Sequence, residues 1–255
     1  MFIPRLIPVL LLKNKGLVKT KKFKDPQYIG DPINAVRIFN DLKADELLFL
    51  DITASKEKRT ISIELVKNIG DEAFMPFGVG GGIKSLNQIE AILRAGAEKI
   101  VINSYATENL KFIEDAVKYF GGQSIVVSVD VKKSIFNQYQ IYSISGKKKN
   151  KIKLLDYLRN IELAGAGELI INSIDNDGMM LGYDLNLIKL VSESVKIPVV
   201  ACGGAGELED FRKGFYTGNA HALAAGSLFV YHGPRRAVLV NYPEKSQIKE
   251  LFKNG

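Results

Sequence analysis

Acidic side chains that end apolar runs are the first candidates for proton transfer in this sequence. Asp130 ends the run "IVVSVD" and is flanked by valines, an environment that can shift a carboxyl pKa into the range of a general acid or base. Asp51 and Asp177 follow two further runs and are open to the same interpretation. Each carboxylate could instead hydrogen-bond a loop or pair with a lysine, which for Asp130 would be Lys132 or Lys19.

The run "LIPVLLLKNKG" (6–16) is an exception, because Leu11 stands where most other runs place Asp, Asn, Ser or Gly. Leucine neither gives nor takes a proton. An acid–base pair that needs one member from this run is therefore incomplete.

Two glycine motifs could bind phosphate. "GVGGGIKS" (78–85) is followed by "INS" (102–104), and "ACGGAGE" (201–207) by "AGS" (225–227). Glycines at a strand end let backbone N–H groups approach an anion, although they could equally serve only to make tight turns. Because the pattern occurs twice, it favours two phosphate sites and a substrate with a phosphate at each end.

Cysteine and histidine are too few for a metal cluster. Cys202 is the only cysteine, so it cannot form an internal disulfide, and we expect a small buried side chain there. His221 and His232 have no partner from which a catalytic triad could be read. We expect neither a metal nor a cofactor.

The charge and the hydropathy limit the partners. The formal net charge is +7, which suggests an anionic partner, and much of it lies in 19–25 and 146–153, which we expect to be loops. Solvated loop tips explain most of these lysines, and no nucleic-acid motif accompanies them. No apolar run is long enough to span a membrane, so we expect a cytoplasmic protein.

The elements that would position these residues alternate between strands and helices. Helical spacing follows an Asp-Pro start at 31–44, and Ser85 and Asp184 are expected N-caps of helices over 85–96 and 184–195. Continuously apolar strands between helices indicate a parallel sheet, and eight such units predict an α/β fold of the (β/α)8 TIM barrel type, with a doubly wound sheet as the alternative. The expected strands are 5–12, 46–52, 76–81, 99–104, 124–131, 168–175, 198–204 and 222–229.

The chain also repeats itself at half its length. "ADELLFLDI" (44–52) resembles "AGELIINSI" (166–174), and "MPFGVGGGI" (75–83) resembles "IPVVACGGAG" (197–206). Such a repeat suggests two fused half-barrels. We expect a single domain over 1–255, with half-barrels at about 1–122 and 123–243 and a C-terminal helix at 244–255.

Over nearly its whole length the sequence resembles the cyclase subunit of imidazole glycerol phosphate synthase. The matching segments are "DELLFLDITASKEKR" (45–59), "FGVGGGI", "AGAEKIVINS" (95–104), "SGKK" (145–148), "GAGELIINSIDNDG" (165–178), "GYD" (182–184) and "GGAG". This resemblance implies a lyase-type synthase subunit in histidine biosynthesis. It also implies a glutaminase partner at the N-terminal face of the barrel, whose ammonia crosses the barrel to a bis-phosphorylated substrate at the other end.

The resemblance also assigns residues. It implies Asp130 as one catalytic aspartate and Lys19 in a mobile first loop over the substrate. An ammonia entrance would be formed by Arg5, Glu46, Lys99 and Glu168. The substrate and phosphate sites would use Asp51, Gly82, Asn103 and Ser104, and, on the other side, Asp177, Gly178, Gly204 and Gly226 or Ser227.

The sequence departs from the family at residue 11, where the family's other catalytic aspartate is replaced by leucine. The tail "GSLFVYHGPRRAVLVNYP" (226–243) is similar to a divergent branch of the family linked to acetamidino modification of surface-polysaccharide sugars. That similarity implies ammonia delivery to a third, sugar-modifying protein and impaired ring closure.

Two other interpretations stay open. The chain could be a working cyclase that tolerates Leu11, or a scaffold without catalysis that activates a glutaminase. The entrance residues distinguish the scaffold from a conduit, since only a conduit needs them.

Overall fold

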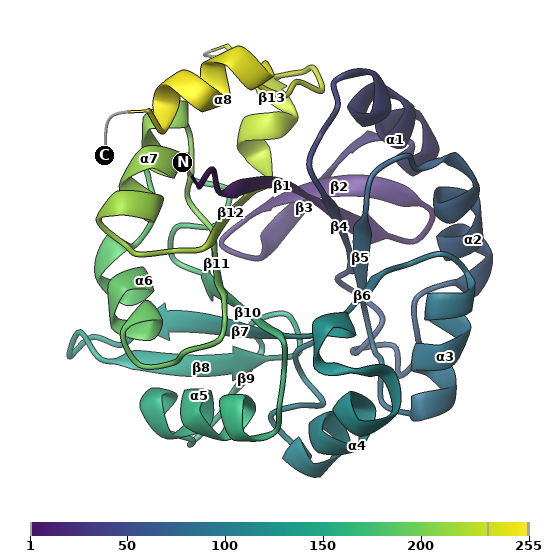
Figure 1. Cartoon of the computed structure of the whole chain (residues 1–255), viewed down its shortest axis with the longest axis vertical. Coiled ribbons are helices and arrows are strands. Elements are labelled where there is room, and N and C mark those ends of the chain that lie inside the picture. Colours follow the sequence, from purple (N-terminus) through teal and green to yellow (C-terminus); the bar gives the residue numbers. More distant parts are fainter. Residues whose placement is uncertain (1, 234, 254–255) are drawn as a thin grey trace.

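Parallel strands form a closed barrel in this protein. The computed structural model describes residues 2–233 and 235–253. Within them, eight parallel strands pair in the order β1, β4, β5, β6, β7, β10, β11, β12 and back to β1 (Figure 1). The bounds are β1 Arg5–Lys13, β4 Leu47–Asp51, β5 Phe77–Gly80, β6 Lys99–Ile102, β7 Ile125–Lys133, β10 Glu168–Ser173, β11 Val199–Cys202 and β12 Ala222–Ala225. The predicted (β/α)8 TIM barrel is confirmed, and the alternative of an open doubly wound sheet is wrong because the ladder closes.

Helices cover the outside of the barrel (Figure 1). Both expected caps are present: Ser85 forms a capping box, and Asp184 accepts a hydrogen bond from the N–H group of residue 187. At the Asp-Pro start, Asp31 accepts hydrogen bonds from the N–H groups of residues 33 and 34. The helices are α1 Pro32–Asp41, α2 Ile63–Glu72, α3 Leu86–Arg94, α4 Leu110–Phe120, α5 Leu154–Leu163, α6 Leu185–Ser192, α7 Leu208–Tyr216 and α8 Lys245–Leu251, with short 3-10 turns η1 Gly122–Ser124 and η2 Ser227–Phe229.

The first basic cluster does not form the loop that its composition predicts. Residues 19–25 lie mostly in an antiparallel hairpin of β2 (Gly16–Lys21) and β3 (Lys24–Gly30), which continues the ladder of β1. Backbone pairing with β1 decides the structure here, although the lysines offer little apolar surface. In the second cluster, only the short β9 (Lys148–Lys149) pairs, with β8 (Tyr139–Ser143).

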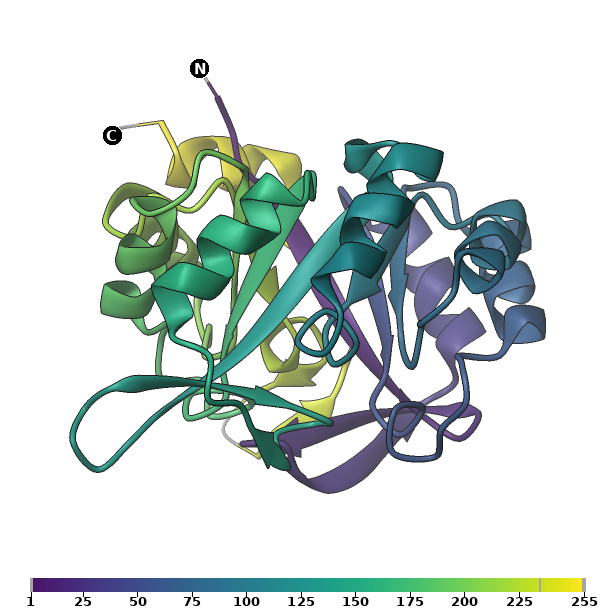
Figure 2. The ribbon, with the colours of Figure 1, turned by 90° about the horizontal axis from the view of Figure 1, so that it is seen from below.

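Both hairpins extend the same end of the barrel. Figure 2 shows the β2–β3 hairpin, in purple, and the β7–β8 hairpin, in teal, below the barrel, opposite the end where N and C are marked. A third, short hairpin joins β13 (Tyr231–His232) to β14 (Ala237–Val238). The hairpins therefore surround the C-terminal ends of the parallel strands.

Successive side chains of a strand point to opposite faces of the sheet, so every second side chain of each barrel strand points into the barrel. On β1 this inward line of side chains reads Arg5, Ile7, Val9 and Leu11, from the N-terminal end of the barrel to the C-terminal end. Ile7 and Val9 belong to the core inside the barrel, and Leu11 packs against it while remaining partly exposed. A separate and larger core lies between the strands and the helices. The inner core thus separates two polar regions, one at each end of the barrel.

The division of the chain into half-barrels stays a proposal. The predicted C-terminal segment contains α8 but starts one residue before it, and its positions 254–255 lie outside the described residues. Among the described residues, no helix is both long enough and apolar enough to cross a membrane.

Candidate functional site

A cavity of about 330 Å³ opens at the C-terminal ends of the barrel strands. Every residue that the sequence assigns to catalysis or to substrate binding lines it, as does Leu11. These residues are Lys19, Asp51, Gly82, Asn103, Ser104, Asp130, Asp177, Gly178, Gly204, Gly226 and Ser227. The fold therefore brings the candidates into one place, whereas what each does there stays a prediction.

Asp130 is buried at the end of the inward line of β7. Its carboxylate accepts hydrogen bonds from Asn103 Nδ2 at 2.9 Å and from Asn172 Nδ2 at 3.1 Å. Burial raises the pKa of Asp130 to about 7, with a further contribution from the charge of Asp177 and against the effect of the two amide hydrogen bonds. In the described part of the chain it forms no ion pair with Lys132 or Lys19. A carboxyl group that titrates near neutrality can serve as either a general acid or a general base.

Leu11 faces this carboxyl group from the other side of the cavity. Its strand β1 and the strand of Asp130, β7, are separated by four steps in either direction around the barrel. The register partner of Leu11 on β4 is Leu50, which also lines the cavity. The inward positions at the ends of β1 and β4 are thus both apolar.

Asp51 is occupied by its own loop. Its carboxylate forms an ion pair with Arg59, with Nη1 2.6 Å from Oδ2, and accepts the N–H groups of Thr53 at 3.0 Å and Ala54 at 3.1 Å. These contacts fix the turn after β4 beside the cavity. Arg59, which the sequence did not single out, is therefore a structural partner of Asp51.

The first glycine motif makes close backbone contacts. At Gly82 φ is +66°, and a Cβ there would lie 1.9 Å from Arg59 O. Ser104, at the end of the next strand, accepts the Ile144 N–H at 3.0 Å. Glycine at 82 is therefore required by packing, and the tight-turn explanation of this motif holds whether or not an anion also binds.

The glycines that the resemblance assigns to the other phosphate site are equally crowded. At Gly178, where φ is +69°, a Cβ would lie 1.9 Å from Thr20 O. At Gly204, where φ is +123°, it would lie 2.1 Å from Gly182 O. Both glycines hold loops in contact across the rim of the cavity.

Lys19 corrects one expectation. It lies in strand β2 instead of a mobile loop, and it is buried with Nζ donating a hydrogen bond to Val9 O. Burial lowers the pKa of Lys19 to about 8, although the nearby carboxylate of Asp177 raises it. A Cβ at Gly226 would lie 2.5 Å from Nζ, so this cation sits beside the second glycine motif. There it could neutralise an anionic group.

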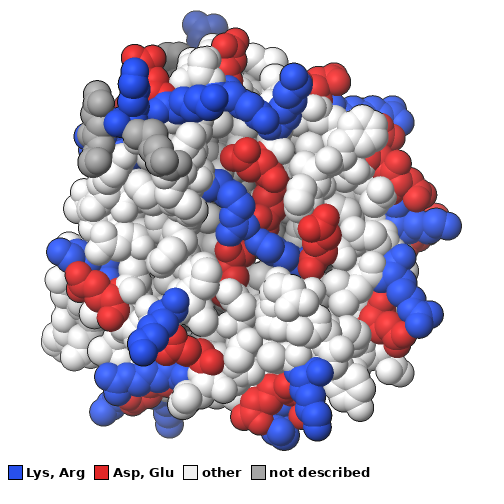
Figure 3. Space-filling model, in the orientation of Figure 1, with Lys and Arg blue, Asp and Glu red and all other residues white. Residues whose placement is uncertain are grey.

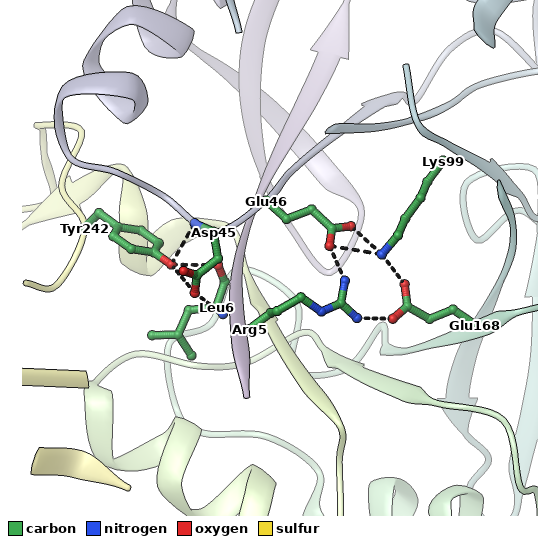
Figure 4. Close-up of polar contacts among 7 residues, drawn as sticks. All are labelled: Arg5, Leu6, Asp45, Glu46, Lys99, Glu168 and Tyr242. Carbon is green, nitrogen blue, oxygen red and sulfur yellow. Dashed lines mark hydrogen bonds and ion pairs between the residues drawn. The ribbon is translucent and has the colours of Figure 1, made fainter. Parts of the chain in front are cut away.

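Four charged residues close a ring at the opposite end of the barrel (Figure 4). Arg5 pairs with both Glu46 and Glu168, and Lys99 Nζ lies 2.9 Å from an oxygen of each of them. The space-filling view down the barrel shows a compact group of acidic and basic side chains at its centre (Figure 3). The side chains of Glu46 and Glu168 are only 3% and 8% exposed, so the ring plugs this end of the barrel. That it admits ammonia stays a proposal.

Asn172 was not assigned to the site from the sequence, although it ends an apolar run. It is the register partner of both Asp130 and Cys202, and its Oδ1 is buried with no hydrogen-bond partner among the described residues. The only available signal was its place at the end of a strand. Cys202 is buried as expected, and burial raises the pKa of its thiol to about 12.

Comparisons with known proteins agree with this geometry. The profile of the family described as histidine biosynthesis protein matches residues 5–234. A protein of Leptospira borgpetersenii, provisionally named imidazole glycerol phosphate synthase subunit HisF, is 46% identical over 250 residues, 98% of each chain. The similarly named hisF2 protein of Pseudomonas aeruginosa is 45% identical over 96% of this chain and 97% of its own. The HisF subunit of Alkaliphilus metalliredigens is 41% identical over 91% of this chain and 92% of its own.

Proposed function

Since this chain belongs to the family of histidine biosynthesis proteins and is HisF-like over its length, we propose that it is the ammonia-accepting synthase subunit of a glutamine amidotransferase complex. In this proposal the barrel conducts ammonia from a glutaminase to an acceptor at its mouth. Its ability to close an imidazole ring is impaired.

Leu11 carries this proposal. The inward line of β1 is continuous from Arg5 in the ring to Leu11 at the mouth, so residue 11 points into the cavity and not into the outer core. A positioned acid or base typically contributes a factor of about 10² to 10⁴ in rate. The inward positions at the ends of β1 and β4 are both leucines, Leu11 and Leu50, whereas Asp130 ends the inward line of β7 on the other side of the cavity. In this proposal Asp51, Asp177 and Lys19, which also line the cavity, do not replace the group that ring closure would need at residue 11.

The N-terminal end of the barrel supports a glutaminase partner. Large apolar side chains are exposed in the segments that precede strands, which lie at this end of a parallel barrel. They are Phe2 before β1, Phe74 before β5, Tyr119 before β7 and Leu163 before β10, exposed by 66%, 87%, 71% and 83%. Exposed large apolar side chains on one face of a protein are typical of an interaction surface. Figure 3 shows mostly uncharged surface around the central group.

The acceptor is the finer part of the proposal. We assign acetamidino modification of a nucleotide-activated sugar for a surface polysaccharide, carried out with a third, sugar-modifying protein at the mouth. The two glycine motifs and the buried cation of Lys19 would suit the diphosphate of such a sugar. The names of two relatives carry numerals, hisF2 in Pseudomonas aeruginosa and hisF3 in Vibrio vulnificus, as expected where a second subunit of this type serves another pathway.

Turnover of the imidazole glycerol phosphate synthase substrate by the purified chain tests the proposal, with ammonium salt in place of a glutaminase. We expect no detectable turnover, and we expect Leu11→Asp to restore some of it. Leu12→Asp is unsuitable as a control because Leu12 is in the outer core, so Leu50→Asp is the matched variant: it places a carboxylate on the neighbouring strand. Turnover by the parent chain within about a hundredfold of a typical kcat of ~10 s⁻¹ would contradict the proposal.

That outcome would favour the second candidate, a working cyclase of histidine biosynthesis. The observation in its favour is Asp130, whose pKa of about 7 suits proton transfer from a single group. A scaffold that only activates a glutaminase is distinguished by Lys99→Ala. This variant should reduce nitrogen transfer from glutamine in a conduit and leave a scaffold unchanged.

A further inference from the structure

A second polar cluster lies just outside the barrel, beside the charged ring (Figure 4). The hydroxyl of Tyr242 lies 2.9 Å from Asp45 Oδ2 and 3.0 Å from Leu6 O, and it accepts the Asp45 N–H at 3.2 Å. Asp45 Oδ2 also accepts the Leu6 N–H at 3.1 Å. One phenol group therefore joins the start of β1 to the segment that enters β4.

These contacts are one residue away from the ring in both segments. Leu6 directly follows Arg5, and Asp45 directly precedes Glu46. Successive side chains along a strand point to opposite faces, so Arg5 and Glu46 point inward where Leu6 and Asp45 are held outside. Any slippage between residues 6 and 45 would separate Arg5 from Glu46.

Tyr242 is built to hold this position. It is 8% exposed, and its ring stacks on Phe229 at 5.4 Å between centroids. Burial and the negative charge of Asp45 raise the pKa of Tyr242, so the hydroxyl keeps its proton and remains a donor. Phe229 ends η2, which begins at Ser227 in the wall of the cavity. Tyr242 therefore packs against a residue two positions along the chain from the wall of the cavity.

We propose that Tyr242 is a positioning residue for the entrance: by joining Leu6 to Asp45 it keeps Arg5 against Glu46 and the ring closed. The positioning is a property of this chain alone. Its effect on ammonia rests on the proposed function.

Tyr242→Phe removes the hydroxyl and keeps the stacked ring. Tyr157→Phe is the matched control, because Tyr157 is also buried but its hydroxyl has no partner within the described part of the chain. On the isolated chain, we expect exchange of the Leu6 amide hydrogen to accelerate at least about tenfold in Tyr242→Phe, and a crystal structure should show Arg5 moved away from Glu46. The control should change neither.

Two results on the isolated chain would overturn the positioning: Arg5 still paired with Glu46 in Tyr242→Phe, or equal changes in the control. Asp45→Asn is a second variant in case Tyr242→Phe does not fold. It retains an acceptor for the hydroxyl but weakens the contact with the Leu6 N–H, and it should move Arg5 in the same direction.

The effect on ammonia is measured in the complex with the glutaminase. Glutamine labelled with ¹⁵N in its amide is supplied with excess unlabelled ammonium, and the ¹⁵N fraction of the product is measured. We expect this fraction to fall about twofold or more in Tyr242→Phe and in Glu46→Gln. The variant that combines both substitutions should give the same fraction as Glu46→Gln alone. A further fall in the double variant would mean that Tyr242 acts elsewhere, which would overturn the inference. If Glu46→Gln leaves the ¹⁵N fraction of the product unchanged, the proposal that the barrel conducts ammonia fails. The positioning role of Tyr242 is then still tested by the position of Arg5 in Tyr242→Phe.

Discussion

Asn172 Nδ2 donates a hydrogen bond to Asp130 Oδ1 across 3.1 Å, and the two residues are register partners on the adjacent strands β7 and β10. The amide therefore orients the carboxyl group whose pKa burial raises to about 7. Asn103 holds the other oxygen from the opposite side. The carboxyl group is fixed in place but remains free to change its charge.

This arrangement makes the stability of the fold depend on pH. In the unfolded chain Asp130 should titrate near its ordinary value of about 3.9. Between about pH 4 and about pH 7 the unfolded state therefore loses a proton that the folded state keeps, so stability falls as pH rises. We expect the Asp130 contribution to reach roughly 4 kcal/mol at most. Asp130→Asn cannot ionise and should be more stable than the parent chain at about pH 8, with a smaller difference at about pH 4.5, as measured by urea unfolding. An equal difference at both pH values would show that the pKa of Asp130 is not raised.

The ring should contribute to stability through the burial of its carboxylates. Glu46→Gln leaves Arg5 and Lys99 with one carboxylate partner each, Glu168, in a largely buried place, and we expect a loss of about 3 kcal/mol in the free energy of unfolding. Glu72→Gln is the control, since Glu72 pairs with the exposed Arg37 at the surface and should change little. Similar losses in the two variants would contradict the burial argument.

Crowding at Gly178 can be separated from its backbone conformation. Gly178 and Gly233 have φ of +69° and +70°, but a Cβ at 178 would lie 1.9 Å from Thr20 O, whereas a Cβ at 233 would meet no atom of the described residues within 4 Å. We expect Gly233→Ala to cost about 1 kcal/mol, from the left-handed conformation alone, and Gly178→Ala to cost at least ~2 kcal/mol more. Thermal unfolding of both variants checks this. Equal losses of stability in the two variants would mean that the backbone at Thr20 moves to accommodate a Cβ at residue 178 without a measurable energetic penalty.

Lys19 should destabilise the empty barrel and favour an anion. The pKa of about 8 lies below the unfolded value of about 10.4, so the folded state loses its proton first and stability rises between about pH 8 and about pH 10. At pH 7 the buried charge costs about 3 kcal/mol. Lys19→Met should recover part of this stability and weaken the binding of inorganic phosphate, as observed by ³¹P NMR. Lys21→Met, at an exposed position of the same strand, should do neither. Unchanged phosphate binding in Lys19→Met would separate this lysine from the anion site.

The barrel could be predicted because its signals are local and repeated. Each strand is a short apolar run, and the helix starts at Asp31, Ser85 and Asp184 carry their own capping side chains. The ends of the strands then had to converge, so a list of strand-end residues was also a list of cavity residues. Leu11 could be recognised as an exception for the same reason.

Other features depend on contacts between distant segments, which no local pattern reveals. The β2–β3 hairpin forms because β1 offers an open ladder, so its lysines suggested a loop. Asn172 contributes through its register with Asp130. Tyr242 lies at the end of the tail, and its partners are Leu6 and Asp45, 236 and 197 positions earlier in the chain. The composition of the chain and the spacing of its residues do not indicate which residues so far apart in the sequence are in contact.

The turn at 176–179 accepts hydrogen bonds from two other segments of the chain. Lys22 N–H, from the first hairpin, donates to Asp177 O at 2.9 Å, and the Arg236 guanidinium donates to Gly178 O at 3.2 Å and to Met179 O at 3.1 Å. Segments from near the beginning, the middle and the end of the chain therefore share one set of hydrogen bonds around the cavity. Movement of this part of the rim therefore requires either that these hydrogen bonds break or that the three segments move together. A collective movement of this kind belongs to the microsecond-to-millisecond range or slower, whereas the rotation of a single exposed side chain takes picoseconds to nanoseconds.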